Sequence, residues 1–323
     1  MQVLVTGAAG KIGQSLVLHL VSEGYRVRGA DLSEGPEVPG VEWCKCDITD
    51  KLALRAAMVD CEAVVHLGAL RLPWLAPEEE VFRVNGYGSF CVFRAAAEAG
   101  IRRVVSASSI NALGMYFGLR RVTVARIPVT EEEGRVTSDV YSFSKQTQED
   151  IADYFHRREG ISSVSLRLGG VAFDPKPEPM PVRAAVQALL AEPREQARER
   201  VRNIVDRFFA RSRDLRERYV DDWVNNSIAT GAAHLWTVLD SRDCDQAFGL
   251  ALAAQVDGAL VINVSDAHNT LGIDARELAS LFYPEAEVDP ALSGTASLWS
   301  IERATNLLGF TPRYSVERFY SSV

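Results

Sequence analysis

The sequence predicts an α/β fold, a doubly wound parallel sheet with a small C-terminal lobe. Short apolar runs of strand length alternate with longer amphipathic segments up to about residue 175, which is typical of consecutive β-α-β units. The first apolar run leads through closely spaced glycines directly into a helical pattern. The 323 residues, of which 47% are apolar and 24% charged, suit one large domain or one domain with a smaller lobe.

The first element is a strand followed by a glycine turn. Residues 3–5 are apolar, and Gly7, Gly10 and Gly13 precede a helical pattern that ends near Gly24. In a dinucleotide-binding turn the first glycine permits a tight bend, the second lets the backbone approach a pyrophosphate, and the third lets the helix pack against the strand. The N–H groups of the helix N-terminus then bind the phosphates. A purely structural turn is the alternative, but the strand–turn–helix context favours a Rossmann-type site.

The second strand, residues 25–30, ends at Asp31. A carboxylate about 20 residues past the glycines accepts the ribose 2′-hydroxyl of NAD and repels the 2′-phosphate of NADP. Arg26 and Arg28 offer a competing phosphate site, but both precede Asp31 within the strand, so NAD is favoured over NADP. An ordinary strand-end turn is the alternative role for Asp31.

The remaining elements of the sheet follow in order. Strands are expected at residues 41–46, 63–67, 104–107 and 163–168, and helices at 50–58, 78–100 and 140–160. The carboxyl ends of parallel strands meet at one edge of the sheet, where ligands bind. The residues expected to line that crevice are Gly7, Asp31, Asp47, Gly68, Ser109 and Gly169.

After residue 175 the pattern changes. Four prolines over residues 175–181 predict an irregular linker. Residues 191–222 predict one or two amphipathic helices, with apolar positions at Val201, Ile204, Val205, Phe208, Leu215 and Tyr219. Acidic residues alternate with the arginines there, which favours a solvated face over a nucleic-acid-binding helix. Further helices are expected at 248–254, 274–281 and 300–308, and a strand at 260–264. 

These elements predict a dinucleotide-binding domain of residues 1–171, to which 236–264 return. Residues 172–235 and 265–323 are expected to form a substrate-binding lobe.

The composition limits the possible partners. A net charge of −8 argues against nucleic acid or a membrane surface as a partner. No apolar run approaches transmembrane length, and the first strand begins at residue 2, so we expect a cytoplasmic protein without a signal peptide. The five cysteines lack a C-x-x-C spacing and are expected to be reduced. The five histidines are scattered, so no metal site is expected.

Tyr141 and Lys145 stand four residues apart and share one face of an expected helix. A tyrosine pKa of about 10 is too high for a base at neutral pH, and a neighbouring cation lowers it. A phenol tuned in this way can act as a general acid or base, and the lysine can also hold the nicotinamide ribose. Ser109, at the end of the preceding strand, is expected to fix the substrate oxygen. A helix-surface pair is the alternative for Tyr141 and Lys145.

These motifs together resemble the extended short-chain dehydrogenase/reductases, specifically the NAD-dependent epimerase/dehydratase family. The resemblance covers nearly all of residues 1–175 and parts of the remainder. It implies a homodimer formed through the helices at 78–100 and 140–160. It implies Ser109, Tyr141 and Lys145 as catalytic residues. The cofactor-binding residues that it implies are Gly7, Ala9, Gly10, Lys11, Ile12, Gly13, Asp31, Asp47, Ile48, Leu67, Gly68, Ala69, Asn85, Tyr141, Lys145, Leu168 and Val171.

The resemblance also implies a small sugar-type substrate. Two departures weaken a nucleotide-sugar substrate: Ala112-Leu113-Gly114 replaces the usual Val-Tyr-Gly, and Trp236 stands near the usual diphosphate-binding arginine. The segment from Ser108 to Gly114 also resembles the uronate dehydrogenases, which oxidise free sugar acids. Substrate contacts are then expected from Ser109, Asn111 and Tyr141, with a strand-end cap as the alternative for Asn111.

The type of reaction stays open at this point. An epimerase or dehydratase returns the hydride to its substrate, whereas a net dehydrogenase of free uronic acids or aldoses releases NADH. A reductase of non-sugar carbonyls is a further possibility. A non-catalytic NAD(P)-binding regulator can dispense with the tyrosine and the lysine, but both are present here, at Tyr141 and Lys145.

Overall fold

A seven-stranded sheet forms the centre of the protein. The computed structural model describes residues 1–176, 178–210 and 222–319. The strands lie in the order β10-β7-β5-β4-β1-β2-β3, and all neighbours are parallel. Their bounds are β1 Gln2–Thr6, β2 Arg26–Asp31, β3 Val41–Lys45, β4 Ala63–His66, β5 Arg103–Ser109, β7 Ser162–Leu168 and β10 Ala259–Val264. The strand order reverses beside β1, which places the ligand crevice at the carboxyl ends of β1 and β4.

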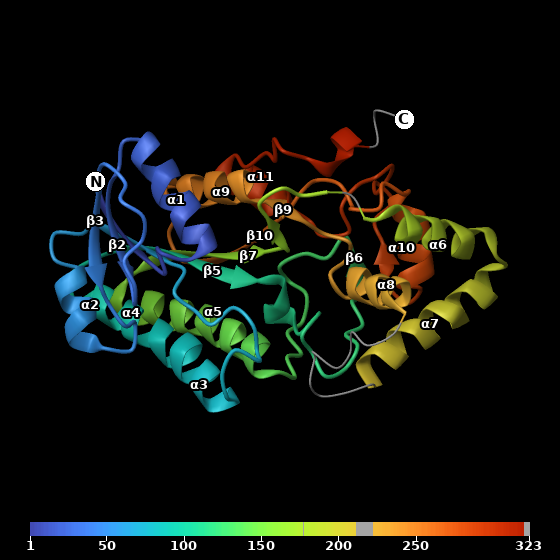
Figure 1. Ribbon diagram of the computed structural model, residues 1–323, viewed down its shortest axis with the longest axis horizontal. Coiled ribbons are helices and arrows are strands. Elements are labelled where there is room, and N and C mark those ends of the chain that lie inside the picture. The colour runs from blue at the N-terminus through green and yellow to red at the C-terminus, as the bar shows by residue number, and fades with distance from the viewer. Residues whose placement is uncertain (177, 211–221, 320–323) are drawn as a thin grey trace.

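Helices cover both faces of this sheet, which confirms the predicted doubly wound α/β fold (Figure 1). One face carries α1 (Lys11–Ser22), α9 (Ser241–Ala253) and α11 (Glu302–Leu308). The other carries α2 (Lys51–Ala57), α3 (Glu78–Phe82), α4 (Gly88–Glu98) and α5 (Val140–Glu159). The strands are apolar on both sides because each side is packed against helices.

The helix expected at 78–100 is interrupted. A π-helix, η1 (Arg83–Tyr87), separates α3 from α4. A single wider turn is too short to set a hydrophobic period of its own, so periodicity does not reveal it. The interruption has a structural consequence, because Asn85 in this turn is buried beside the crevice.

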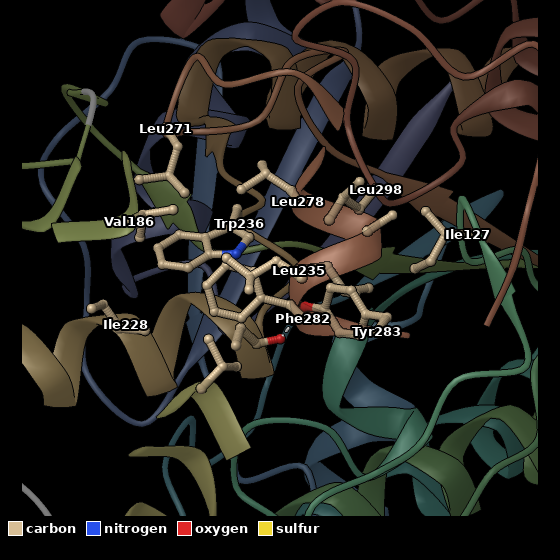
Figure 2. Close-up of a cluster of buried hydrophobic side chains, with 14 of the residues drawn as sticks. Ile127, Val186, Ile228, Leu235, Trp236, Leu271, Leu278, Phe282, Tyr283 and Leu298 are labelled. Carbon is tan, nitrogen blue, oxygen red and sulfur yellow. Dashed lines mark hydrogen bonds between the residues drawn. The ribbon is translucent and has the colours of Figure 1, made fainter. Parts of the chain in front are cut away.

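A second group of helices lies beyond the carboxyl ends of the strands (Figure 1). It contains α6 (Met180–Ala191), α7 (Arg194–Ala210), α8 (Trp223–Ala233) and α10 (Ala275–Phe282). Figure 2 shows part of its apolar core, in which Trp236 and Phe282 pack edge to face with ring centroids 5.5 Å apart. Two pairs of short strands connect this group to the rest: β6 (Arg126–Ile127) with β11 (Glu287–Val288), and β8 (Val171–Ala172) with β9 (Leu239–Asp240).

The prolines of residues 175–181 were expected to form an irregular linker, but α6 begins within them at Met180. Pro181 occupies its first turn, where a missing N–H removes no helical hydrogen bond. The amphipathic helix expected from residue 191 is α7, which buries Val201, Val205 and Phe208. The expected apolar positions Leu215 and Tyr219 lie outside the described residues. None of the helices in the part of the chain that the structure describes has the length and apolar character required to cross a membrane.

Candidate active site

The glycine turn between β1 and α1 packs tightly against the neighbouring backbone. Gly7 has a left-handed φ of +71°, and a Cβ there would lie 2.7 Å from the backbone nitrogen of Gly68. A Cβ on Gly13 would overlap the carbonyl oxygen of Gly7. The requirement at Gly10 is milder, because its Cβ would lie 3.2 Å from the same oxygen. These steric requirements are those of a dinucleotide-binding turn, in which the N–H groups at the N-terminus of α1 would bind the pyrophosphate.

Asp31 lies at the edge of this turn. Its carboxylate accepts hydrogen bonds from the backbone N–H groups of Ala9, at 3.0 Å, and Leu32, at 2.7 Å. Arg28 is directed elsewhere, because it forms an ion pair with Glu42 at 2.9 Å and donates to the carbonyl of Ala57. One of the two guanidinium groups that could have favoured a 2′-phosphate is thus engaged by Glu42, which fits NAD better than NADP.

Asp47 and Ile48 follow β3 at the same edge. Asp47 accepts hydrogen bonds from the backbone N–H and the hydroxyl of Thr49, both at 2.8 Å. Burial raises the pKa of Asp47, but these hydrogen bonds and the nearby charge of Arg83 outweigh it, so the pKa lies below its usual value. Ile48 is buried and packs beneath Gly68, where a Cβ would lie 3.1 Å from its side chain.

A chain of buried hydrogen bonds joins β1 to β4. The Thr6 hydroxyl lies 2.8 Å from Nδ1 of His66 and also accepts from the Gly68 N–H, and Nε2 of His66 lies 3.0 Å from the hydroxyl of Ser89. Burial, with the charge of Lys145, lowers the pKa of His66 to about 3, so the imidazole is neutral. This chain holds the loop that begins at Leu67 and carries Gly68 and Ala69.

Asn85 holds the same loop from the opposite side. Its amide accepts from the Leu70 N–H at 2.7 Å and donates to the Leu70 carbonyl at 3.0 Å. It also donates to the Ser144 hydroxyl at 3.2 Å, so one side chain links the loop to α5. The structure gives Asn85 a positioning role; a direct contact with the cofactor stays a prediction.

Ser109, Tyr141 and Lys145 come together at the carboxyl end of β5. All three side chains are buried, with exposed fractions of 8%, 8% and 5%. Burial raises the pKa of Tyr141 to about 12, and a hydrogen bond with Ser109 opposes that rise. The arrangement can therefore hold a hydroxyl or carbonyl oxygen between Ser109 and Tyr141 and exchange a proton with it.

Lys145 does not act on Tyr141 as its spacing predicts. The ammonium group donates to the Ala107 carbonyl at 2.7 Å and to Oε1 of Gln148 at 3.2 Å, and lies 5.9 Å from the Tyr141 ring centroid. Burial lowers the pKa of Lys145 to about 8, while the charge of Glu149 opposes this. The expected lowering of the Tyr141 pKa is corrected here, because burial of the phenol dominates and its pKa rises instead.

Asn111 lies in the short helix η2 (Ile110–Leu113), which begins at Ser109. Its side-chain oxygen accepts from the N–H groups of Tyr116, at 3.0 Å, and Phe117, at 3.2 Å. Its amide nitrogen donates to the Ser109 hydroxyl at 3.3 Å. Asn111 thus holds the turn and orients Ser109, and its contact with a substrate stays a prediction.

Aromatic residues that the sequence motifs do not single out form one wall of the crevice. Phe117 packs edge to face against Tyr141, with ring centroids 5.2 Å apart, and against Trp74 at 5.7 Å. Tyr116 contacts both Phe117, at 4.8 Å, and His234, at 4.0 Å. Trp74, Tyr116 and Phe117 belong to two loops, and His234 ends α8. These segments are far apart in the sequence, so no sequence motif predicts that their rings come together.

Arg167 lies next to the end of β7. It is buried against Glu149 of α5, with two nitrogen–oxygen distances of 2.8 Å, and Ser108 donates to the same carboxylate. Leu168 ends β7 and Val171 begins β8, so these two remain at the crevice. Within the described ranges, no three His, Cys, Asp or Glu side chains are grouped so that they could hold a metal ion.

Comparison with known families gives one match that covers more than half of the chain. A model of the NAD dependent epimerase/dehydratase family matches residues 3–198. That range contains the glycine turn, Asp31 and all three of Ser109, Tyr141 and Lys145.

Individual relatives match over shorter ranges. The uronate dehydrogenase of Pseudomonas syringae pv. tomato is 30% identical over 177 residues, which cover 54% of this chain and 61% of that protein. The NAD-dependent glucose-6-phosphate dehydrogenase of Haloferax volcanii is 33% identical over 180 residues, covering 52% of this chain and 68% of that protein. The chain thus spans about three fifths of the length of the uronate dehydrogenase that it matches.

Solved structures resemble the whole chain. The glucuronic acid dehydrogenase from Chromohalobacter salexigens has a TM-score of 0.63 at 21% identity, and the match covers 100% of this chain and 88% of that one. At this identity the likeness shows the fold.

Proposed function

Because the chain belongs to the NAD-dependent epimerase/dehydratase family, we propose that it is an NAD-dependent oxidoreductase acting on a sugar or sugar derivative. The observation that carries the proposal is the placement of Ser109, Tyr141 and Lys145, all buried, at the sheet edge that also holds the glycine turn. The relatives that match this part of the chain include two kinds of sugar dehydrogenase, which favours a sugar-type substrate.

In the proposed reaction the chain's own residues bind the substrate oxygen and move its proton. The Ser109 hydroxyl, oriented by Asn111, hydrogen-bonds the oxygen of the reacting carbon. Tyr141 accepts the hydroxyl proton as the carbon–oxygen bond becomes a carbonyl; this step requires its phenolate form, which the positive charges of Lys145 and of a bound nicotinamide would favour. Bound NAD supplies the acceptor for the hydride that leaves the same carbon. Lys145, held by Ala107, stands beside Tyr141 and provides a cation for the nicotinamide ribose to approach.

Two finer versions of this function differ in the fate of the hydride. A net dehydrogenase of free uronic acids or aldoses releases NADH, and the uronate dehydrogenase relatives favour this version. An epimerase or dehydratase returns the hydride to its substrate, which the family assignment also allows. A panel of uronic acids, aldoses and nucleotide sugars, assayed with NAD, separates them. NADH accumulation indicates a dehydrogenase, whereas loss of substrate without NADH indicates an epimerase or dehydratase.

The phenol of Tyr141 provides the sharpest test. We expect Tyr141→Phe to lower turnover by about 10²- to 10⁴-fold, the usual contribution of a general acid or base, while NAD still binds. Turnover and the dissociation constant of NAD would be measured on the same preparation. Tyr154→Phe is the matched control, because Tyr154 is a half-exposed phenol on the same helix. If the Tyr141 variant lost neither property, or lost both together, the assignment would be wrong.

A non-catalytic NAD(P)-binding regulator is the second candidate. It would bind NAD and turn over none of the panel, and Tyr141→Phe would then change nothing that can be measured kinetically. The buried position of both Tyr141 and Lys145 favours the enzyme, because burying two ionisable groups is costly without a use for them.

A further inference from the structure

Gln148 of α5 is a buried polar residue that the Ser109–Tyr141–Lys145 site does not include. It stands three residues after Lys145 and seven after Tyr141, so the three side chains share one face of the helix. Gln148 is 2% exposed. Its amide oxygen accepts a hydrogen bond from the Lys145 ammonium at 3.2 Å. Gln148 is therefore in direct contact with one of the three residues of the site.

The ammonium of Lys145 has three N–H groups, and the protein binds two of them. One donates to the backbone carbonyl of Ala107 at 2.7 Å, and the other donates to Gln148. A single acceptor would leave the ammonium free to rotate about its bond to the side chain, whereas two acceptors fix that rotation. The direction of the third N–H is then determined, and this group is left for a bound molecule.

Both acceptors of Lys145 are dipoles without a net charge. The carboxylate whose charge acts on Lys145 is that of Glu149. Its oxygens accept from Arg167, at two distances of 2.8 Å, and from Ser108 at 2.6 Å, and neither oxygen is hydrogen-bonded to the ammonium. Arg167 thus balances the charge of Glu149. An amide at position 148 holds the ammonium without cancelling its positive charge, which a carboxylate there would do.

The other end of the Gln148 amide is buried without a partner among the described residues. Its nitrogen makes no hydrogen bond. Turning the amide over would place this nitrogen against the ammonium, donor against donor, so Lys145 determines the orientation. An unsatisfied buried donor destabilises the folded state, and an apolar side chain of similar length, such as methionine, would avoid it. Packing alone therefore does not explain a glutamine here, whereas the hydrogen bond to Lys145 does.

The titratable groups that face Lys145 are Tyr141, Glu149 and His66. The Tyr141 ring centroid lies 5.9 Å from the ammonium, and burial raises the pKa of this phenol to about 12. Burial, with the charge of Lys145, lowers the pKa of His66 to about 3. Glu149 is paired with Arg167. Burial lowers the pKa of Lys145 itself to about 8, so its charge changes in a range where neither Tyr141 nor His66 titrates.

We propose that Gln148 is a positioning residue of the reaction. It holds the Lys145 ammonium so that the third N–H binds the nicotinamide ribose and the positive charge favours the phenolate of Tyr141. In this role Gln148 acts through Lys145. The proposal rests on the proposed function and adds to its site a residue that the spacing of Tyr141 and Lys145 does not indicate.

NADH is the probe for the test, because its nicotinamide ring is uncharged and its binding requires no turnover. Fluorescence titration of the purified chain between pH 6 and pH 10 measures its dissociation constant. A charged ammonium binds a ribose hydroxyl more strongly than a neutral amine does. The affinity should therefore fall, by about tenfold, as the pH rises through the pKa of Lys145. Lys145→Met should remove this pH dependence, which assigns it to Lys145.

Gln148→Met removes the acceptor while nearly keeping the length of the side chain. The midpoint of the fall should then move down by about one pH unit, the effect of one hydrogen bond to a charged group. Gln148→Glu keeps an acceptor and adds a negative charge, so the midpoint should move up.

Gln146→Met and Gln146→Glu are the matched controls. Gln146 lies on the same helix, but neighbours in sequence do not face each other on a helix, and its side-chain oxygen accepts from the Thr137 hydroxyl at 2.8 Å. Both controls should keep the midpoint of the unsubstituted protein. Urea unfolding shows that each variant is folded before it is titrated, and if Gln148→Met does not fold, the upward shift in Gln148→Glu decides.

A midpoint that stays in place in the Gln148 variants, or that moves in the same direction in both, would overturn the proposal. So would an affinity of the unsubstituted protein that does not change with pH. Either result, combined with loss of turnover in Tyr141→Phe, leaves the proposed function standing. Midpoints that move as expected, while no sugar of the panel is turned over, would support the positioning of Lys145 by Gln148 and contradict the proposed function.

Discussion

Single residues in this protein have ionisation states that depend more on burial than on the neighbour next in sequence. Tyr141 stands four residues from a lysine, yet the pKa of the phenol rises because the ring is enclosed. His66 lies on a strand of the sheet and is kept neutral by burial, which suits it to orient a loop through hydrogen bonds. The common cause is the loss of hydration, which penalises the charged form of every group.

Asp245 of α9 shows the same effect at a site away from the crevice. It is 4% exposed, and burial raises its pKa to about 7 from 3.8, with the Ser15 hydroxyl of α1 as its hydrogen-bond donor. Between these two values the folded state binds the proton more tightly than the unfolded state. The free energy of unfolding contributed by Asp245 is therefore highest below about pH 4 and falls as the pH rises toward 7.

We therefore expect Asp245→Asn to be more stable than the unsubstituted protein at pH 8, by about 2–4 kcal/mol, and nearly equal to it at pH 4. Urea unfolding at pH 4, 6 and 8 measures the difference. Asp257→Asn, on an exposed loop, is the control and should show no such trend. A difference that stays constant with pH would show that the effect comes from packing and not from ionisation.

Among the elements, α5 connects the reacting residues to the sheet. Tyr141, Lys145 and Glu149 follow one another at four-residue intervals and so share one face of the helix. Glu149 forms a buried ion pair with Arg167 of β7, with exposed side-chain fractions of 2% and 3%. This pair fixes the helix against the strand next to the one that ends at Ser109, so it positions the reacting residues without contacting them.

We expect Glu149→Gln to lower the free energy of unfolding by about 3–5 kcal/mol, because it leaves the Arg167 guanidinium buried without its charge partner. Adding Arg167→Met should recover part of that loss, since a buried ion pair can be replaced by apolar contacts more cheaply than it can be broken. Urea unfolding of both variants measures this. The control is Asp153→Asn, which breaks the exposed Asp153–Arg157 pair on the same helix and should cost less than about 1 kcal/mol. If the double variant were instead less stable than Glu149→Gln alone, the two losses of unfolding free energy would add, and the coupling between Glu149 and Arg167 would be contradicted.

At the scale of the whole molecule, an aromatic surface runs across the helices of one face. Tyr87, Phe90, Phe143 and Tyr154 are between 36% and 47% exposed, and they lie on η1, α4 and α5. Phe90 contacts Tyr154 with ring centroids 6.4 Å apart, so the side chains of two helices form a shared surface. Exposed aromatic clusters of this kind commonly mark protein–protein interfaces. We propose that this surface joins two copies of the chain in a homodimer.

Phe143→Arg should therefore shift the protein from dimer to monomer in sedimentation velocity, because two introduced charges would face each other across the symmetric interface. Phe173→Arg is the matched control: Phe173 is 48% exposed, close to the 47% of Phe143, but lies just after β8 and away from these helices. The proposal fails if the unsubstituted protein is a monomer, or if both variants behave alike.

The order of strands and helices was predictable from the sequence, because each element has a local hydrophobic period and the glycine turn has a steric requirement. The predicted doubly wound sheet and the family resemblance are confirmed. The π-helix around Asn85 was not predictable, since its five residues are too few to set a hydrophobic period of their own. The helix starting at Met180 was missed because prolines mark loops and helix N-termini alike.

The sequence by itself determined the parts of the site that depend on backbone sterics and on short spacing. Gly7 and Gly13 leave no room for a Cβ. Asp31 is the last residue of β2, so its place at the carboxyl end of that strand does not depend on which strands lie beside it. The tertiary structure alone decided which partner holds Lys145 and how deeply Tyr141 is buried. It also decided which aromatic ring packs against Tyr141. The reason is physical: these environments are built from segments far apart in the chain, and hydration is lost only when those segments pack together.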